Sequence, residues 1–126
     1  VLREQGRLNE AETLYEETLT AQDALFGRDS AGALGTATGL AETWRLQGRP
    51  AAAEAAMADV LPKMVTVQGE DHPETLVAML VFARTLVDQG RVAEGRDIAV
   101  TVFEKAARTL GSHHSVTVEA QNMAGD

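Results

Sequence analysis

Apolar residues recur every three or four positions along most of the chain, a spacing that places them on one face of an α-helix. Leu34, Ala37, Ala41 and Trp44 share such a face. The pattern predicts helices over residues 8–26, 31–47, 50–68, 73–89 and 92–110, and another that begins near Ser115. Residues 1–5 have the character of the end of one more helix. No segment alternates at the period of two that half-buried strands show, so the pattern predicts an all-α protein.

The residues between these helices repeat with a period of 42. The tripeptide Gln-Gly-Arg occurs at residues 5–7, 47–49 and 89–91, and a second glycine series falls at Gly27, Gly69 and Gly111. Glycine readily takes the left-handed conformation that ends helices, so both series, Gly6 included, are expected to end them. Ser30 is a good N-cap for the helix that follows it. Each period therefore holds two antiparallel helices.

These motifs resemble the long tetratricopeptide repeat of kinesin light chains, a repeat also attached to bacterial and fungal nucleotide-binding signalling ATPases. The resemblance rests on Gln-Gly-Arg, on Ala11-Glu12 in the next helix, and on Gly-x-Asp-His-Pro-x-Thr-Leu at residues 69–76. It covers the whole chain and implies a right-handed superhelical solenoid of antiparallel helix pairs. Residues 1–126 would then be a single array of about three 42-residue units, cut within a repeat at both ends.

One position departs from the family pattern. Ala11 and Ala53 resemble the small residue found early in the second helix of each pair, whereas the third repeat has Gly95 there. Glycine inside a helix is expected to cost about 1 kcal/mol relative to alanine.

The resemblance also implies a binding site, because the first helix of each pair lines a concave groove that holds a peptide or a helix of a partner. Carried over by register, the groove positions are Arg3, Gly35, Thr38, Glu42, Arg45, Val77, Leu80, Arg84, Val87, Glu119 and Asn122. Paired asparagines hold the ligand backbone in the kinesin light-chain pattern, and only Asn122 matches them. This argues against motor-cargo binding of the kinesin type.

Two features of these positions suggest different partners. Arg3, Arg45 and Arg84 would line one channel and suit an acidic peptide, since arginine grips carboxylates with two hydrogen bonds. The alternative is that each arginine pairs with a nearby glutamate, such as Arg45 with Glu42 or Glu4. The apolar centre of the groove, formed by Val77, Leu80 and Val87, would instead suit an amphipathic helix.

Composition excludes several classes of function. The 126 residues are 44% hydrophobic and 24% charged, as in ordinary globular proteins, and the net charge of −8 argues against non-specific binding to nucleic acid or anionic membranes. No apolar stretch approaches the roughly 18 residues of a membrane helix. The absence of cysteine fits a reducing compartment, although it is compatible with others, and we expect a cytoplasmic protein.

Candidate chemistry is sparse. Gly32, Gly35 and Gly39 share one helix, so we interpret them as small residues that let a neighbouring helix or a ligand approach, and not as a phosphate loop. His113 and His114 could suggest a metal or nucleophile site. They occupy the repeat position of Asp71-His72, however, which favours a helix cap. The sequence predicts no enzyme activity, no cofactor and no bound metal.

The leading hypothesis is a protein–protein interaction scaffold that belongs to a larger regulatory or signalling protein. One alternative is a structural array that stacks head to tail, joined through apolar residues of its terminal helices. On the first of these helices we expect Leu14, Leu19 and Leu25 to be only partly covered, and on the last we expect the same of Val116, Val118 and Met123. The other alternative is a regulatory segment of an enzyme whose catalytic domain lies outside this chain.

Overall fold

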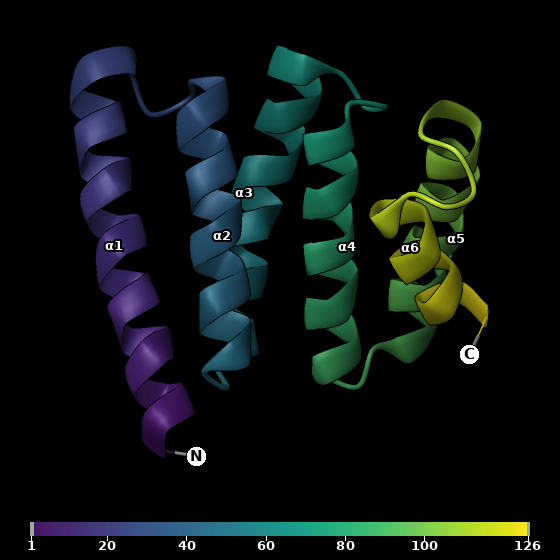
Figure 1. Cartoon of the computed structure of the whole chain (residues 1–126), viewed down its shortest axis with the longest axis horizontal. Coiled ribbons are helices and arrows are strands. Elements are labelled where there is room, and N and C mark those ends of the chain that lie inside the picture. The colour runs from purple at the N-terminus through teal and green to yellow at the C-terminus, as the bar shows by residue number, and fades with distance from the viewer. Residues whose placement is uncertain (1, 126) are drawn as a thin grey trace.

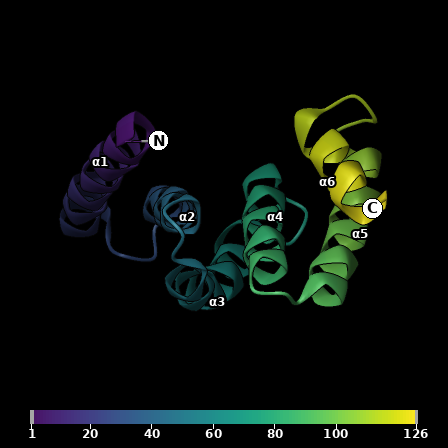
Figure 2. The same cartoon turned by 90° about the horizontal axis from the view of Figure 1, so that it is seen from below.

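The computed structural model describes residues 2–125, so the predictions for Val1 and Asp126 lie outside it. These residues form six α-helices and contain no strand. The helices are α1 (Leu2–Phe26), α2 (Ala31–Leu46), α3 (Pro50–Gln68), α4 (Pro73–Asp88), α5 (Val92–Thr109) and α6 (Ser115–Gly125). Neighbouring helices run antiparallel, each packed on the next (Figure 1). In Figure 2, α2, α4 and α6 follow one another along one side of the array, with α3 and the start of α5 on the other.

The predicted helices from residue 31 onward begin where expected and end within one residue of the prediction. Ser30 caps α2, since its Oγ accepts a hydrogen bond from the amide of Ala33 at 3.3 Å. The glycines between the later helices have positive φ, for example +81° at Gly48 and +86° at Gly90. After each of these two glycines, an arginine amide donates to a carbonyl of the preceding helix.

The prediction that Gly6 ends a helix is wrong, because α1 runs without a break from Leu2 to Phe26. A turn at this place would cost several intrahelical hydrogen bonds. At Gly48 that cost is offset, because the 16-residue helix α2 ends there and packs antiparallel against α3. Residues 2–5 do not fold back on α1, so nothing offsets that cost at Gly6, and the helix continues through it.

Two hydrophobic clusters hold the array together. Each is centred on the second helix of a helix pair, α3 or α5. In the first cluster, Met57 and Met64 of α3 are fully buried between α2 and α4. In the second, Val102 and Ala106 of α5 are fully buried between α4 and α6. Burying one such large side chain stabilises the fold by about 1.5–3 kcal/mol. Because α4 contributes to both clusters, it couples the two neighbouring repeats.

Gly95 sits where α5 crosses α4. A Cβ atom at Gly95 would lie 2.8 Å from the carbonyl oxygen of Ala83 and 2.6 Å from Cγ2 of Val87. The matching crossing of α2 and α3 has Ala41 and Ala53, both fully buried. The departure from alanine therefore has a packing reason, since only glycine allows this close an approach of the two helices.

At residues 47–49 and 89–91, the Gln-Gly-Arg tripeptide ties the turn within a helix pair to the helix that precedes the pair. Glu12 of α1 accepts hydrogen bonds from Gln47 (3.1 Å), Arg49 (3.1 Å) and Nε1 of Trp44 (2.9 Å). One period later, Glu54 of α3 accepts hydrogen bonds from Gln89 (2.6 Å) and Arg91 (2.7 Å). These hydrogen bonds hold the pKa of both carboxyl groups below its ordinary value. The largest contribution comes from Trp44 for Glu12 and from Gln89 for Glu54. The tripeptide thus acts as a repeated latch.

The packing at Gly95 predicts opposite effects of the same substitution at two helical glycines. Gly95→Ala should lower the free energy of unfolding by about 1–3 kcal/mol, because the helices must move apart. Gly35→Ala should raise it by up to about 1 kcal/mol, since alanine favours the helix and the nearest atom to its Cβ is an ordinary 3.8 Å away. Urea denaturation followed by circular dichroism measures both. A stabilised Gly95→Ala would contradict the close crossing.

The latch predicts a pH-dependent contribution to stability. Because the pKa of Glu54 is lowered by folding, its contribution is complete above the unfolded pKa of about 4.3 and is lost as the pH falls through the folded value. Glu54→Gln should therefore lower the urea midpoint at pH 7, and the difference from the unmodified protein should shrink on acidification below about pH 4. Glu104→Gln, at an exposed position of α5, is the control. A difference that stays constant with pH would disprove the assignment.

Candidate protein-interaction groove

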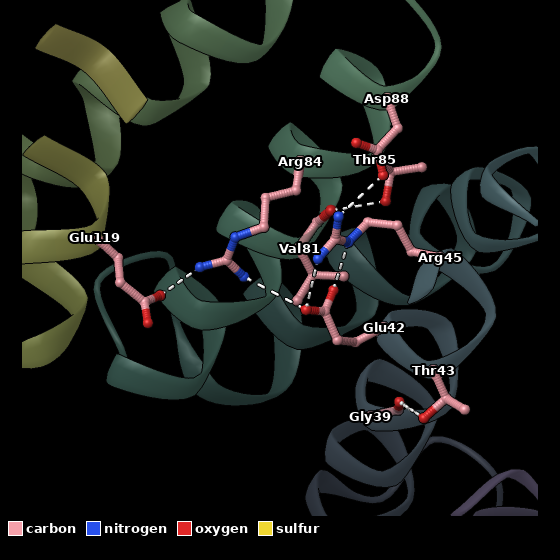
Figure 3. Close-up of polar contacts among 9 residues, drawn as sticks. All are labelled: Gly39, Glu42, Thr43, Arg45, Val81, Arg84, Thr85, Asp88 and Glu119. Atoms are coloured by element: carbon pink, nitrogen blue, oxygen red, sulfur yellow. Dashed lines mark hydrogen bonds and ion pairs between the residues drawn. The ribbon is translucent and has the colours of Figure 1, made fainter. Parts of the chain in front are cut away.

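Five charged residues form an ion-pair ladder along the face of the array made by α2, α4 and α6, here called the inner face (Figure 3). Arg45 donates two hydrogen bonds to Glu42, at 2.9 and 3.0 Å, and a third to Asp88 at 2.9 Å. Arg84 donates to Glu119 and also lies 3.7 Å from Glu42. The ladder thus joins the first helices of three successive repeats.

The ladder changes the interpretation of the inner-face arginines. The alternative that the arginines pair with nearby carboxylates is confirmed for Arg45 and Arg84, including the pairing of Arg45 with Glu42. Glu42 and, to a lesser degree, Asp88 raise the pKa of Arg45, whose side chain is only 16% exposed. Two arginines stand against three carboxylates here. The expectation of a channel of free cations for an acidic ligand is therefore wrong for Arg45 and Arg84.

Arg3 does not belong to this face in the way that the register implied. It lies, exposed, in the first turn of α1, and not on a separate first helix. The register assumed a turn at Gly6 that would have folded the preceding residues back. Since α1 continues through Gly6, that basis is lost.

The prediction that Leu80 lines the groove is also wrong. Leu80 is only 1% exposed and packs in the second hydrophobic cluster with α5 and α6. Thr38 is 7% exposed, and its hydroxyl group donates to the carbonyl oxygen of Leu34. Register places a residue on a face, whereas the depth of burial depends on the neighbouring helices. At these two positions the side chains serve packing first.

A hollow of about 370 Å³ opens near the start of α2 and α4, and we call it the glycine hollow. Its wall includes the predicted positions Gly35, Thr38 and Val77, and Val77 is 41% exposed. The wall also includes Tyr15 and Glu74, which sequence reasoning did not place in the groove. The carboxylate of Glu74 accepts a hydrogen bond from Gln68 at 3.1 Å. Because Glu74 lies in the first turn of α4, its only signal in the sequence was the one that suits a helix start.

A second hollow, of about 340 Å³, lies near the other end of α4, and we call it the methionine hollow. It brings together the predicted positions Val87 and Asn122 from α4 and α6. Val92, Arg96 and Met123 complete its wall. The contribution of α5 was not predicted, since the family rule assigns the groove to first helices alone.

Gly32 and Gly39 of α2 and the histidine His114 have structural roles. The side chains of Gln22 and Tyr15 fill the space beside Gly32 and Gly39, while Gly35 stays open toward the glycine hollow. The interpretation as points of close approach is confirmed for Gly32 and Gly39. Nδ1 of His114 accepts a hydrogen bond from the amide of Val116 at 3.2 Å. His72 does the same for Glu74, which confirms the helix-cap interpretation for His114. Residues 2–125 contain no group of three or more histidine, aspartate or glutamate side chains arranged to hold a metal.

Comparisons with known proteins agree with the helix-pair fold. The tetratricopeptide repeat family matches residues 1–64 and again residues 75–115. No curated protein matches the chain. No helix in the described part of the chain combines the length and apolar character needed to span a bilayer.

Among solved structures, the chain is similar to the nearly identical TPR-like repeats of a candidate kinesin light chain from Podosopora anserina and to a variant of those repeats. The TM-score is 0.83 for both, with 23% identity, so the likeness concerns the fold. Each alignment covers 97% of this chain, but only 58% and 59% of the solved chains. Tetratricopeptide repeats form non-catalytic scaffolds that generally mediate protein–protein interaction. The helix-pair solenoid and the two family matches together establish that this chain belongs to the tetratricopeptide repeat family.

Proposed function

We propose that this chain is a protein-interaction scaffold that binds a basic, amphipathic segment of a partner protein along its inner face. The observation that carries the proposal is the charge balance of that face. Arg45 and Arg84 are already paired with carboxylates, and Glu74 adds a further carboxylate whose described partner is the neutral Gln68. With Arg96 of the methionine hollow counted, four carboxylates stand against three cations. A ligand that brings lysine or arginine therefore meets a complementary surface.

The two hollows support an amphipathic ligand over a uniformly charged one. Val77 in the glycine hollow, with Val87 and Met123 in the methionine hollow, offers apolar contact on either side of the ion-pair ladder. An extended peptide or a helix can place apolar side chains in both and basic side chains between them. The mixture of apolar and acidic groups then selects for residue order as well as composition.

The same proposal covers what the scaffold does not do. We propose that it acts by binding alone, without catalysis, nucleic acid or membrane association, within a larger regulatory or signalling protein of the cytoplasm. The support is the family's scaffold character and the net charge of −8. A regulatory role beside a separate catalytic domain needs only the same groove.

Self-association is the second candidate, and a specific observation favours it. Leu14, Leu25 and Phe26 of α1 are 63%, 74% and 73% exposed, whereas Leu19 is half-buried. Leu14 and Leu25 lie on the same side of α1, because eleven residues make about three helical turns. Exposed apolar side chains gathered on one side of a helix mark association sites. On α6, Val118 is 40% exposed, whereas the expectation for Val116 is wrong, since it is buried in the second hydrophobic cluster. A head-to-tail contact between the terminal helices of two copies would cover them and can propagate, because the two surfaces differ.

The groove is tested by selecting random displayed peptides on the immobilised chain. We expect the selected peptides to combine Lys or Arg with Leu, Val or Phe, and their affinity to fall with rising salt. Val77→Lys should weaken binding about tenfold or more, by loss of apolar contact and by repulsion. Val100→Lys on α5 is the matched control, since both valines are 41% exposed. Selection of acidic peptides, or equal losses from the two variants, would refute the proposal.

Self-association is tested by sedimentation equilibrium over a range of concentrations. The alternative predicts assemblies that grow with concentration. Phe26→Ser should dissociate them, since the substitution removes a large exposed apolar side chain. Phe26→Ser should leave peptide affinity on the inner face unchanged. If the chain stays monomeric at high concentration, self-association is refuted and peptide binding in the groove remains the proposed function.

A further inference from the structure

A third hollow, here called the outer pocket, lies between α1 and α3 and has α2 as its floor. Its volume is about 280 Å³. Its apolar wall includes Leu19, Ala37, Leu40, Trp44, Ala56 and Val60. At this size it is at the lower end for sites that hold small molecules, about 300–1,000 Å³, and is better suited to one or two side chains of a partner.

The outer pocket faces away from the inner face. Ala37, Leu40 and Trp44 follow one another at steps of three and four residues, so they lie on one side of α2. At 100° per residue, Glu42 of the ladder lies nearly opposite these residues, whereas Arg45 lies about a quarter turn from them. No residue that lines the outer pocket lines the glycine hollow or the methionine hollow. A ligand in the outer pocket therefore does not compete directly with one on the inner face.

The internal repeat explains why the pocket is open. One period later, Ala37 is replaced by Met79, Leu40 by Phe82 and Ala56 by Ile98. Met79 and Ile98 pack against the second hydrophobic cluster, and Phe82 packs against the first. The hollow therefore results from small residues at positions that the next repeat fills, within the same backbone framework.

The rim of the outer pocket is acidic. Asp29 and Asp59 share the single cation of Lys63, at 3.0 and 3.3 Å, and Asp23 lies 3.9 Å from the exposed guanidinium group of Arg28. Three carboxylates thus face two cations.

Further along α1, Glu16 lies seven residues before Asp23, on the same side of the helix, and adds another negative charge. At the other end of the pocket Arg49 stacks over the ring of Trp44 at 5.4 Å, but Glu12 pairs with it at 3.1 Å, so the net charge around the pocket stays negative.

We propose that the outer pocket is a second docking site, which binds an amphipathic helix of a partner protein through a bulky apolar side chain flanked by lysine or arginine. The pocket runs along α2 from Ala33 to Trp44. Eleven residues of helix span about 16 Å, which accommodates about three turns of a bound helix. Apolar anchors at helical spacing would enter between α1 and α3, and basic residues beside them would meet the rim. This site is independent of the function proposed for the inner face.

Trp44 allows a direct test, because it is the only tryptophan of the chain and lines the pocket. The probe is a synthetic helical peptide without tryptophan, with leucines on one face and lysines beside them. The control peptide has glutamates in place of the lysines. The lysine peptide should change the emission of Trp44 saturably, and more weakly at high salt. The glutamate peptide should not. Equal responses to both peptides would overturn the proposal.

Two variants locate the binding. Ala37→Met, which copies Met79 of the next repeat, should fill the pocket and weaken the lysine peptide about tenfold or more. Ala51→Met, at an exposed position of α3, is its control. Asp23→Lys changes only the rim and should shift preference from the lysine peptide toward the glutamate peptide, so the test does not depend on how Ala37→Met folds.

Other outcomes separate this site from other occupants and from the inner face. Val77→Lys should leave the response of Trp44 to the lysine peptide unchanged. A loss caused by Val77→Lys, together with unchanged affinity in Ala37→Met and Asp23→Lys, would place the peptide on the inner face and overturn the proposal. If the unliganded chain forms dimers that Ala37→Met dissociates, the occupant is a second copy of the chain, and the proposal is likewise overturned.

Discussion

The burial of each second helix between two first helices is the constraint on which the rest of the structure depends. Met57 and Met64 are out of solvent only because α2 and α4 cover α3 from two sides. No single helix pair can supply that cover, so the stability of one repeat depends on the next. The close crossing at Gly95 and the latch at Glu54 are refinements of this arrangement, since both fix how closely and at what angle adjacent helices meet.

The same constraint shapes the inner face. Stacking brings α2, α4 and α6 near enough for Arg45 and Arg84 to bridge carboxylates of neighbouring repeats. Partly buried charges are stable only when paired, because a lone charge there would lose most of its hydration. The arginines are therefore committed to the fold. In the function that we propose, recognition depends on the carboxylates that remain and on the apolar hollows beside them.

Variation between repeats creates individual sites within a common framework. Exchanging Ala37 for Met79 from one repeat to the next leaves the helices in place and alters only how much space lies between them. Gly35 likewise opens the glycine hollow where the next repeat has Val77. A solenoid can thus carry different pockets on its two sides at little cost to its core, because the positions that change lie beside the fully buried ones.

The sequence by itself determined the helices and their pairing. Helix starts at Ser30 and His72 and helix ends at Gly48 and Gly90 depend on hydrogen bonds and backbone angles within a few residues, so their signals are local and readable. The 42-residue period then implied the stack. Only the tertiary structure decided that α1 passes through Gly6, that Leu80 is core, and that Arg45 reaches Asp88. These outcomes depend on which side chains meet between helices, and a pattern that repeats along one chain does not contain that information.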